Sequence, residues 1–520
     1  MKMVIFVMFA WLMSMTSWSH AQTPAFGTLL WSNSFKTQAD LDAGSGSGSL
    51  APVLGRGSVL ALVSPNAGGS ATRNFILPVE RLRARYISVS ADVKAENVSA
   101  KPQPWNGVKL MVKIDTPAGT QWPQPQIGIG SFDWTHFASR LLIPAEATAV
   151  TLVLGLESVT GKAWFDNARI TFVKSIQLAA PAPANQPIFR GHNLSRLRGA
   201  MVSPGSLTRS DLQTFADWGG NLIRWQLIRS NMPDDQNIPE AYDRWLDDQL
   251  HRLDQGLDWA RSMGIMVVVD LHSPPGGKNS AGGYQAAMGG IFSDPRAQSR
   301  FVDVWKKITN RYKGEKQIWG FDLVNEPVDD TASDGCDDWQ GLALRAGRAV
   351  QEIDPARVLI VECPSWGSPD GFTGFQPIPL PHVVYSVHMY NPGEFTHQGV
   401  FSPSVPVQYP GKISGVVWDK SALEKSLAPA IQFAKRYRVN MYVGEFSAIR
   451  WAPGGERYLS DLIDIFEENG WDWSYHAYRE WSGWSVEHSD VKGEEQPTTT
   501  PTARKLLLQR WFKQNQRAKQ

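Results

Sequence analysis

Two glutamates, Glu326 and Glu445, stand at the ends of short apolar runs that are typical of buried β-strands. Glu326 closes the run 319–325, and Glu445 closes the run 440–444. A carboxylate at a strand end adds little to core packing, but it is well placed for acid/base or nucleophilic chemistry. Two such groups in one site can divide a hydrolysis between them, one as acid/base and the other as nucleophile, as in retaining cleavage of a glycosidic bond.

Further polar and aromatic residues lie at the predicted ends of other strands. They are of types that bind hydroxyl groups, orient carboxylates or stack on sugar rings. No His-Glu-x-x-His pattern or close His/Asp cluster accompanies them, so no catalytic metal is predicted. The residues are Arg224 on the second strand, His272 after the third, Asn325 before Glu326, His388 and Tyr390 on the sixth strand, and Trp481 after the eighth.

The elements that must position these residues lie within 188–520, where apolar strands alternate with amphipathic helices. Eight such units predict a (β/α)₈ TIM barrel, whose working groups gather at the C-terminal ends of the strands. The predicted strands are 189–193, 221–228, 265–271, 318–324, 358–362, 383–389, 441–443 and 473–478. The predicted helices are 242–262, 295–312, 339–353, 422–437, 456–468 and 502–513.

Residues 22–175 have a different pattern, because short alternating β-runs are broken by Gly, Pro and Ser and no helix of convincing length is found. The runs 86–93, 108–114 and 149–156 predict half-buried antiparallel strands, and therefore an all-β sandwich. The proline- and alanine-rich stretch 176–187 is predicted to be a linker between the sandwich and the barrel.

Three motifs in the predicted barrel together resemble glycoside hydrolase family 5. They are Asn325-Glu326-Pro327, His388-Met389-Tyr390 and Gly444-Glu445-Phe446. Asn-Glu-Pro also occurs in family 1, but there the nucleophile lies in Glu-Asn-Gly, whereas Phe446-Ser447 follows Glu445 here. The resemblance covers 188–520 and implies a cellulase-like, retaining β-glycoside hydrolase that works by double displacement without a cofactor.

The resemblance assigns Glu326 as the acid/base and Glu445 as the nucleophile. Glu326 must begin protonated, so its pKa is expected to be raised by partial burial and by the neighbouring carboxylate. Glu445 must be ionised, with Arg224 and Tyr390 placed to hold it. Asn325 is expected to bind the sugar 2-hydroxyl. The remaining expectations are that His272 and His388 position hydroxyl groups or the acid/base, and that Trp481 stacks on a sugar ring.

The substrate is left open by the sequence. Internal cleavage of a β-1,4-glucan is the preferred expectation, and a β-mannanase, a β-1,3- or β-1,6-glucanase and an exo-acting β-glycosidase of the same family are the alternatives. A non-catalytic carbohydrate-binding protein is the alternative from another class, but a pure binder has no need of both carboxylates. The long aromatic loops 273–294 and 391–420 are expected to build sugar subsites and to decide the linkage.

The stretch 131–172 resembles the last half of jelly-roll carbohydrate-binding modules. The likeness implies a β-sandwich, often with a structural calcium ion, and leaves open whether the domain binds sugar or only stabilises its neighbour. Trp105 and Trp122 are candidates to stack on sugars, whereas Trp134 and Trp164 are expected in the core. The likeness rests on Asp133-Trp134-Thr135, Ile143-Pro144-Ala145 and the run Ala-Trp-Phe-Asp-Asn-Ala-Arg-Ile at 163–170.

The composition and the N-terminal residues restrict the class of ligand and the cellular location that can be expected. The 51 Lys and Arg residues nearly cancel the 50 Asp and Glu residues. Such a balance fits a neutral β-linked oligo- or polysaccharide better than a nucleic acid or an acidic membrane surface. Residues 1–21 predict a signal peptide, and hence a secreted or periplasmic protein without a membrane span. A disulfide between Cys336 and Cys363 and the oligomeric state are left open.

Overall fold

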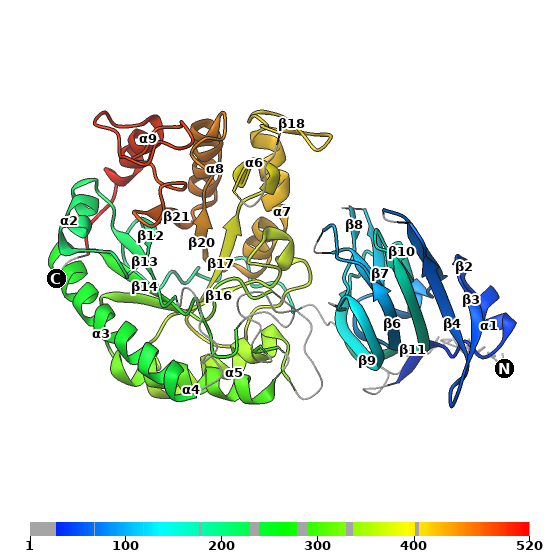
Figure 1. The fold of residues 1–520 in the computed structure, drawn as a ribbon. Coiled ribbons are helices and arrows are strands. Elements are labelled where there is room, and N and C mark those ends of the chain that lie inside the picture. The colour runs from blue at the N-terminus through cyan, green and yellow to red at the C-terminus, as the bar shows by residue number, and fades with distance from the viewer. Residues whose placement is uncertain are drawn as a thin grey trace, which may run out of the picture.

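The computed structural model describes residues 28–518, apart from 67, 104, 118, 126, 176–178, 229–238, 278–289, 293, 329–335 and 401–404. An all-β sandwich precedes an α/β barrel (Figure 1), so the predicted fold class is confirmed. The predicted signal peptide lies outside the described residues. Among the helices that the structure describes, none combines the length and the apolar character that a membrane crossing needs.

The sandwich is built from two antiparallel sheets. Alternate residues of its long strand β6 (Arg85–Val98) are buried between the sheets, which is the period-two pattern that the sequence shows. One sheet has the order β3-β4-β11-β6-β9, with β1 paired to β11. It comprises β1 (Leu29–Asn33), β3 (Ser49–Val53), β4 (Gly57–Ser64), β6 (Arg85–Val98), β9 (Gly130–Ile143) and β11 (Gly161–Ser175). The other, ordered β2-β5-β10-β7-β8, comprises β2 (Ser45–Gly46), β5 (Ser70–Ile76), β7 (Gly107–Thr116), β8 (Gly119–Gln121) and β10 (Ala149–Glu157).

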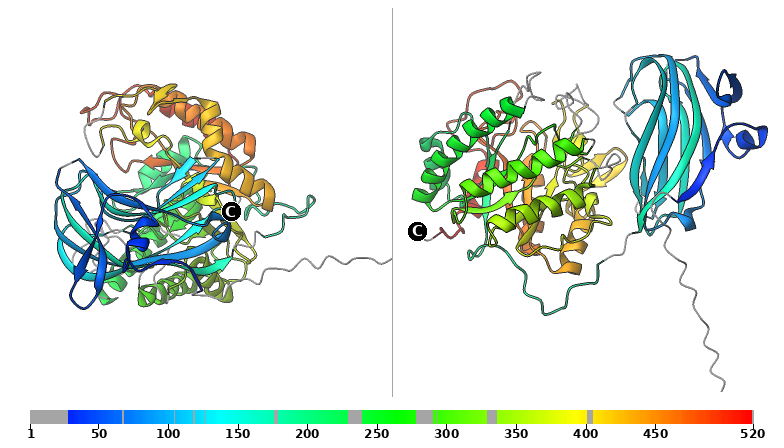
Figure 2. Two further views of the ribbon diagram at one scale, coloured as in Figure 1. Left: turned by 90° about the vertical axis from the view of Figure 1, so that its right-hand side faces the viewer. Right: turned by 90° about the horizontal axis from the view of Figure 1, so that it is seen from below.

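The barrel is closed by parallel strands in chain order, and helices cover its outside (Figure 2). Every residue of most of these strands is buried, because side chains fill one face and helices cover the other. The strands are β12 (Arg198–Val202), β13 (Leu222–Gln226), β14 (Met266–Asp270), β15 (Ile318–Asp322), β16 (Leu359–Glu362), β17 (Val383–Met389), β20 (Met441–Phe446) and β21 (Asp472–Tyr478). The main helices are α2 (Arg209–Asp217), α3 (Pro239–Met263), α4 (Pro295–Arg311), α5 (Trp339–Ile353), α7 (Lys420–Tyr437), α8 (Gly455–Asn469) and α9 (Ala503–Phe512).

The prediction of the first barrel strand was wrong. Residues 189–193 form no strand, and β12 begins at Arg198 instead. The segment 189–193 includes Gly191 in the left-handed region (φ 72°), and it lies at the N-terminal end of the barrel, where the His192 ring reaches the Asp472 carboxylate at 3.1 Å. The strand β12 was missed because its small residues give a weak β signal. They are needed there, since a Cβ atom on Gly199 would stand 1.9 Å from the Leu222 carbonyl oxygen.

The two segments that the sequence left uncertain have definite places in the structure. The described part of the linker runs along the barrel, where the Ala182 amide donates to the Arg436 carbonyl oxygen at 3.0 Å. Cys336 and Cys363 are both buried as thiols, so the disulfide that the sequence permitted does not form. The Cys363 thiol instead donates to the Ser368 carbonyl oxygen at 3.1 Å.

Candidate active site

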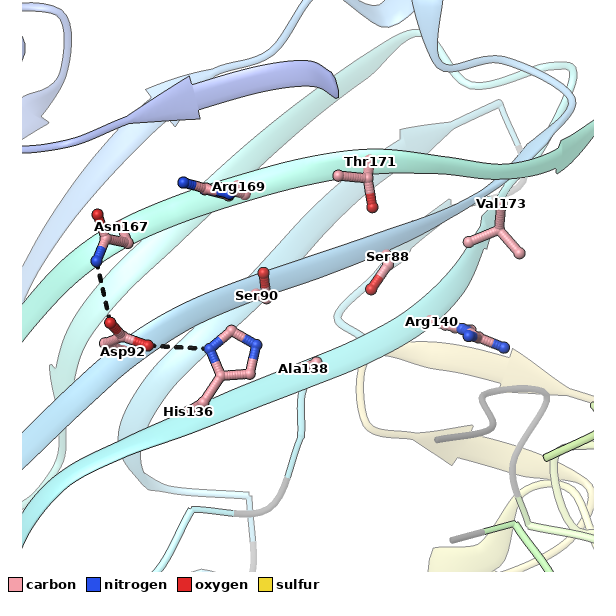
Figure 3. Close-up of a pocket in the computed structure, with 10 residues that line it drawn as sticks. All are labelled: Ser88, Ser90, Asp92, His136, Ala138, Arg140, Asn167, Arg169, Thr171 and Val173. Atoms are coloured by element: carbon pink, nitrogen blue, oxygen red, sulfur yellow. Dashed lines mark hydrogen bonds and ion pairs between the residues drawn. The ribbon is translucent and has the colours of Figure 1, made fainter. Parts of the chain in front are cut away.

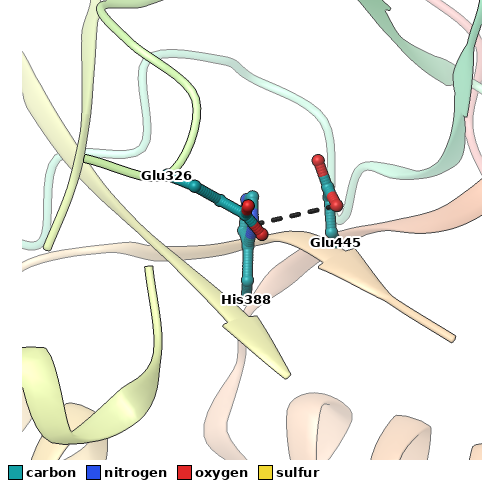
Figure 4. Close-up of side chains that lie close together, drawn as sticks. All are labelled: Glu326, His388 and Glu445. Carbon is teal, nitrogen blue, oxygen red and sulfur yellow. Dashed lines mark hydrogen bonds and ion pairs between the residues drawn. The ribbon is translucent and has the colours of Figure 1, made fainter. Parts of the chain in front are cut away.

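The two glutamates converge at the C-terminal end of the barrel strands. Glu326 follows β15, Glu445 belongs to β20, and His388 of β17 lies between them (Figure 4). A side-chain oxygen of each glutamate and a ring nitrogen of His388 all lie within 4.8 Å of one another. Retaining glycosidases hold their carboxyl groups about 5–5.5 Å apart, whereas inverting enzymes leave about 6.5–9.5 Å for a water molecule. The arrangement therefore has the geometry of retention.

Glu445 is held at both oxygens. Arg224 Nη1 donates to Oε1 at 2.6 Å, and the Tyr390 hydroxyl donates to Oε2 at 2.8 Å. Burial by itself raises the pKa of the Glu445 carboxyl, but the charges of His388, His476 and Arg224 outweigh it and hold that pKa well below its usual range. Glu445 is therefore an ionised, fixed carboxylate at neutral pH.

Glu326 is presented by a strained backbone turn. Its φ of 48° lies in the left-handed region, which costs a non-glycine residue about 1–3 kcal/mol and is frequent at active sites. The turn is held by Glu362 at the end of β16, whose Oε2 accepts the Glu326 amide proton at 2.8 Å. The side chain of Glu326 is more exposed than that of Glu445, and its Oε1 lies 3.1 Å from His388 Nδ1.

His388 connects the acidic groups of the site. Its Nε2 lies 3.2 Å from Glu362 Oε1, and its Nδ1 lies 3.8 Å from Glu445 Oε2. Burial lowers the pKa of His388, but Glu362 and Glu445 outweigh burial and raise that pKa well above its usual value. The ring is therefore an imidazolium that donates one N–H to Glu326 and directs the other to Glu362.

Arg224 is fully buried and compensates several acidic side chains at once. Its guanidinium contacts Glu445, Glu362 at 2.9 Å, Asp322 at 2.9 Å and Asp270 at 3.2 Å. Burial raises the pKa of Asp322 well above its usual range; Arg224 opposes the shift, and Glu362 and Asp270 add to it. Asp322 thus takes up a proton more readily than an ordinary aspartate, and a proton there would reduce the negative charge packed around one guanidinium. The planar fork of arginine suits this set of acceptors, and lysine could not reproduce it.

Asn325 and His272 form an oriented pair beside the glutamates. The Asn325 carbonyl oxygen accepts from Arg224 Nη2 at 3.1 Å, and its Nδ2 lies 3.2 Å from His272 Nε2. His272 Nδ1 in turn contacts the Asp270 carboxylate at 2.9 Å. These contacts fix the Asn325 amide with its NH₂ group toward His272, and leave one N–H of that group for a ligand.

Trp481 is the one predicted site residue that stays outside this network. Its side chain is 43% exposed, and its ring packs edge-on against Trp484 at 5.7 Å and Trp451 at 6.2 Å. Trp484 connects it to the site, since the Trp484 ring also contacts the His476 ring at 5.6 Å. The remaining predicted residues, Glu326, Glu445, Arg224, His272, Asn325, His388 and Tyr390, share one contact network.

Sequence reasoning missed several acidic and histidine residues of this network. Glu362 ends a predicted strand, so the strand-end rule that found the other residues could have found it. Asp322 and His476 lie within the predicted strands 318–324 and 473–478, and only the inward alternation of side chains could have indicated them. The loop aromatics Phe292, Phe395 and Tyr409 are buried and pack the loops rather than lining subsites. Tyr284 and Phe401 lie outside the described residues.

Comparison with known proteins agrees with the geometry. A sequence model of the cellulases of glycosyl hydrolase family 5 matches residues 182–482. The chain belongs to this family. This family 5 enzyme is therefore a retaining β-glycoside hydrolase with a β-glycan substrate, and catalysis in the family requires no cofactor.

Individual relatives of this family 5 chain cover its barrel. Endoglucanase C of Acetivibrio thermocellus is 29% identical over 299 residues, which are 52% of this chain and 84% of that protein. Cellodextrinase A of Ruminococcus flavefaciens is 25% identical over 280 residues, 52% of this chain and 79% of its own length. A solved structure described as a glycoside hydrolase shares the fold, with a TM-score of 0.50 and 21% identity over 61% of this chain and 99% of that one.

Proposed function

We propose that this enzyme cleaves β-1,4-glucan chains internally, with Glu445 as nucleophile and Glu326 as acid/base. The observation that carries the mechanism is the close approach of two carboxyl groups, one of which is ionised and held from both sides. The substrate and the internal mode of cleavage are proposed from relatives that are named endoglucanases. A polymeric substrate suits a secreted or periplasmic enzyme, and a chain processed after Ala21 outside the cytoplasm would support that location.

The two steps follow from the contacts of the glutamates. The Glu445 carboxylate attacks the anomeric carbon while the glycosidic C–O bond breaks, and Glu326 gives its proton to the departing oxygen. In the second step the Glu326 carboxylate takes a proton from water, the water oxygen attacks the anomeric carbon, and the bond to Glu445 breaks. The imidazolium of His388 stabilises Glu326 each time that it becomes a carboxylate, and the remaining Asn325 N–H is placed for the sugar 2-hydroxyl.

The same trio of Glu326, His388 and Glu445 is close enough in distance to hold a metal ion. A metal needs the neutral imidazole, however, and both ring nitrogens of His388 face carboxylate oxygens, Glu326 Oε1 at 3.1 Å and Glu362 Oε1 at 3.2 Å, which favours a proton on each. We therefore propose acid/base and nucleophilic chemistry for the trio. A structural calcium ion in the sandwich stays a prediction.

The substrate proposal is tested by product sizing on a panel of polysaccharides. We expect a β-1,4-glucan to be the best substrate, with a rapid fall in viscosity and early oligosaccharides of several lengths. Release of a single small product from the outset would show exo action, and faster cleavage of mannan or of a β-1,3- or β-1,6-glucan would replace the proposed linkage. The Glu445→Gln protein serves as the blank for contaminating activity.

We further propose that the sandwich binds glycan in a groove of about 450 Å³ on the outer face of β6, β9 and β11 (Figure 3). At one end the Asp92 carboxylate accepts from Asn167 at 3.0 Å and Arg56 at 2.9 Å, and it contacts the His136 ring at 2.9 Å. Burial raises the pKa of Asp92, but these three partners outweigh it and lower that pKa to about 2. The groove thus offers a fixed, ionised acceptor for sugar hydroxyls.

The aromatic candidates of the sandwich lie apart from that groove. Trp105 and Trp122 are exposed, and Trp122 borders a second groove, between the sandwich and the loop at Pro364 and Ser365 of the barrel. Trp134 and Trp164 are half-buried rather than in the core, and the Arg56 guanidinium lies 4.2 Å from the centre of the Trp134 ring. The core prediction for these two tryptophans was wrong because both lie on strand positions that face outward.

Binding to insoluble cellulose tests the sandwich groove without interference from hydrolysis when all variants carry Glu445→Gln. We expect Asp92→Ala to weaken binding about tenfold, the effect of losing one charged hydrogen bond. Asp115→Ala on β7 of the opposite sheet is the matched control and should bind normally. Unchanged binding of Asp92→Ala together with a loss in Trp122→Ala would move the site to the second groove.

A further inference from the structure

His476 of β21 extends the network behind the nucleophile. Its Nδ1 lies 2.5 Å from the Tyr390 hydroxyl, which donates to Glu445 Oε2, and the same Nδ1 lies 3.6 Å from that oxygen. Its Nε2 faces Glu480 Oε1 at 3.5 Å. Glu480 is anchored through its other oxygen, which accepts from Gln226 Nε2 at 2.8 Å. A continuous line of polar contacts thus joins Gln226 of β13 to Glu445.

The protons along this line can be placed from the donors and acceptors alone. Tyr390 has one hydroxyl proton, and it donates that proton as a hydrogen bond to Glu445, whose carboxylate has only acceptors. His476 Nδ1 must then donate to the Tyr390 oxygen, because two acceptors cannot face each other at that distance. His476 Nε2 faces a carboxylate and must also carry a proton. Both ring nitrogens are therefore donors, which makes the ring an imidazolium.

The charged groups around His476 favour the same state. Glu480 follows β21 in the chain, Glu445 faces His476 from β20, and the charge of Glu326 acts in the same sense. His397, after α6 (Gly393–Thr396), opposes that state, and so does the imidazolium of His388, which faces the same Glu445 Oε2 from β17. Burial lowers the pKa of His397. Burial also lowers the pKa of His476, but Glu480 and Glu445 outweigh it and raise that pKa above the usual value.

We infer that His476, held by Glu480, is a positioning residue that directs the Tyr390 hydroxyl to donate its hydrogen bond to Glu445 and adds a positive charge beside the nucleophile. The inference rests on the proposed role of Glu445 and deepens it. With His476 charged, the Tyr390 hydroxyl has no acceptor other than Glu445, so one nucleophile oxygen is always held. The added charge also keeps Glu445 ionised toward lower pH than His388, Arg224 and Tyr390 alone would.

The pH profile of kcat/KM tests this role, because a merely structural histidine would not shift it. The acidic limb of the profile reports ionisation of the nucleophile in the free enzyme. In His476→Gln we expect that limb to move to higher pH by about one unit, since loss of an opposite charge at this distance raises a carboxyl pKa by that order. The matched control is His251→Gln on the outer face of α3, where the acidic limb should not move.

The protonation state of His476 can be measured directly in the wild-type protein, which guards against a His476→Gln chain that fails to fold. Nitrogen NMR of histidine-labelled enzyme should show a ring with both nitrogens protonated at pH 7 that is absent from His476→Gln. In Glu480→Gln that ring should lose its second proton at a lower pH than in the wild type. A neutral His476 ring at pH 7 in the wild type would overturn the inference.

The failure of this inference is separable from that of the proposed function. If Glu445→Gln stays active, the nucleophile assignment fails and the inference falls with it. If Glu445→Gln is inactive while His476→Gln keeps the wild-type acidic limb, the nucleophile stands and only the role of His476 is overturned. Tyr390→Phe provides the remaining comparison. The change His476→Gln should shift the acidic limb of the kcat/KM profile less in a Tyr390→Phe protein than in the wild type.

Discussion

Glu445→Gln is expected to lower kcat/KM on β-glucan by about 10⁴-fold or more, because the attacking carboxylate is removed. Glutamine is nearly isosteric, its one oxygen can still accept from Arg224, and its NH₂ group can donate to the Tyr390 oxygen, so the fold should survive. The matched control is Glu468→Gln on α8, which breaks only the exposed ion pair with Lys420 and should leave activity unchanged. Activity within tenfold of wild type in Glu445→Gln would rule out Glu445 as the nucleophile.

The smaller variant Glu445→Gly tests the assignment of Glu445 as nucleophile by a gain of activity rather than a loss. Deleting the side chain opens a space beside the anomeric carbon, where azide can attack in place of the carboxylate. With an activated β-glycoside, added azide should restore turnover and give an α-glycosyl azide, since only one inversion takes place. A β-glycosyl azide from this variant would exchange the roles of the two glutamates.

Glu326→Ala is expected to show the second large effect, and the size of that effect should depend on the leaving group. On a natural glycan the rate should fall by about 10²–10⁴-fold, the usual contribution of a general acid. On a dinitrophenyl β-glycoside the first step should be nearly unchanged, because that leaving group departs without a proton. Azide should accelerate the second step and give a β-glycosyl azide. The measurement is the burst and steady-state rate on both substrates.

An equal loss of Glu326→Ala activity on both substrates would contradict the acid/base assignment. His388→Gln is the informative comparison, since His388 contacts Glu326 and Glu445 but donates no proton to the leaving group in the proposed mechanism. It should slow both substrates to a similar degree. A strong dependence on the leaving group in His388→Gln would instead make His388 the acid.

The sequence could predict the barrel and most of its site because each strand is a buried apolar run with its polar residue at the end. That rule correctly placed Glu326, Asn325, His388 and Glu445 on one rim of the barrel. It failed at β12, where close strand pairing requires Gly199 and leaves too few apolar residues to mark a strand. A local sequence pattern does not contain the distance between two neighbouring strands.

The rest of the site depends on contacts between distant segments, which no local pattern contains. Glu362 matters because it holds the Glu326 turn, and His476 because it reaches Tyr390. Trp481 was predicted to stack on a sugar ring, and in the structure Trp484, three residues later, packs against both the Trp481 ring and the His476 ring. These contacts depend on how far each side chain extends across the barrel, which residue type and spacing alone do not predict.

Trapping of the covalent intermediate tests the central claim, retention through Glu445, most directly. The wild-type enzyme would be incubated with a 2-deoxy-2-fluoro β-cellobioside that has a good leaving group, then digested and analysed by peptide mass spectrometry. Retention through Glu445 predicts one added glycosyl group on the peptide that contains this residue, and none in Glu445→Gln. A label on Glu326, or an inverted product with no label on either glutamate, would contradict it.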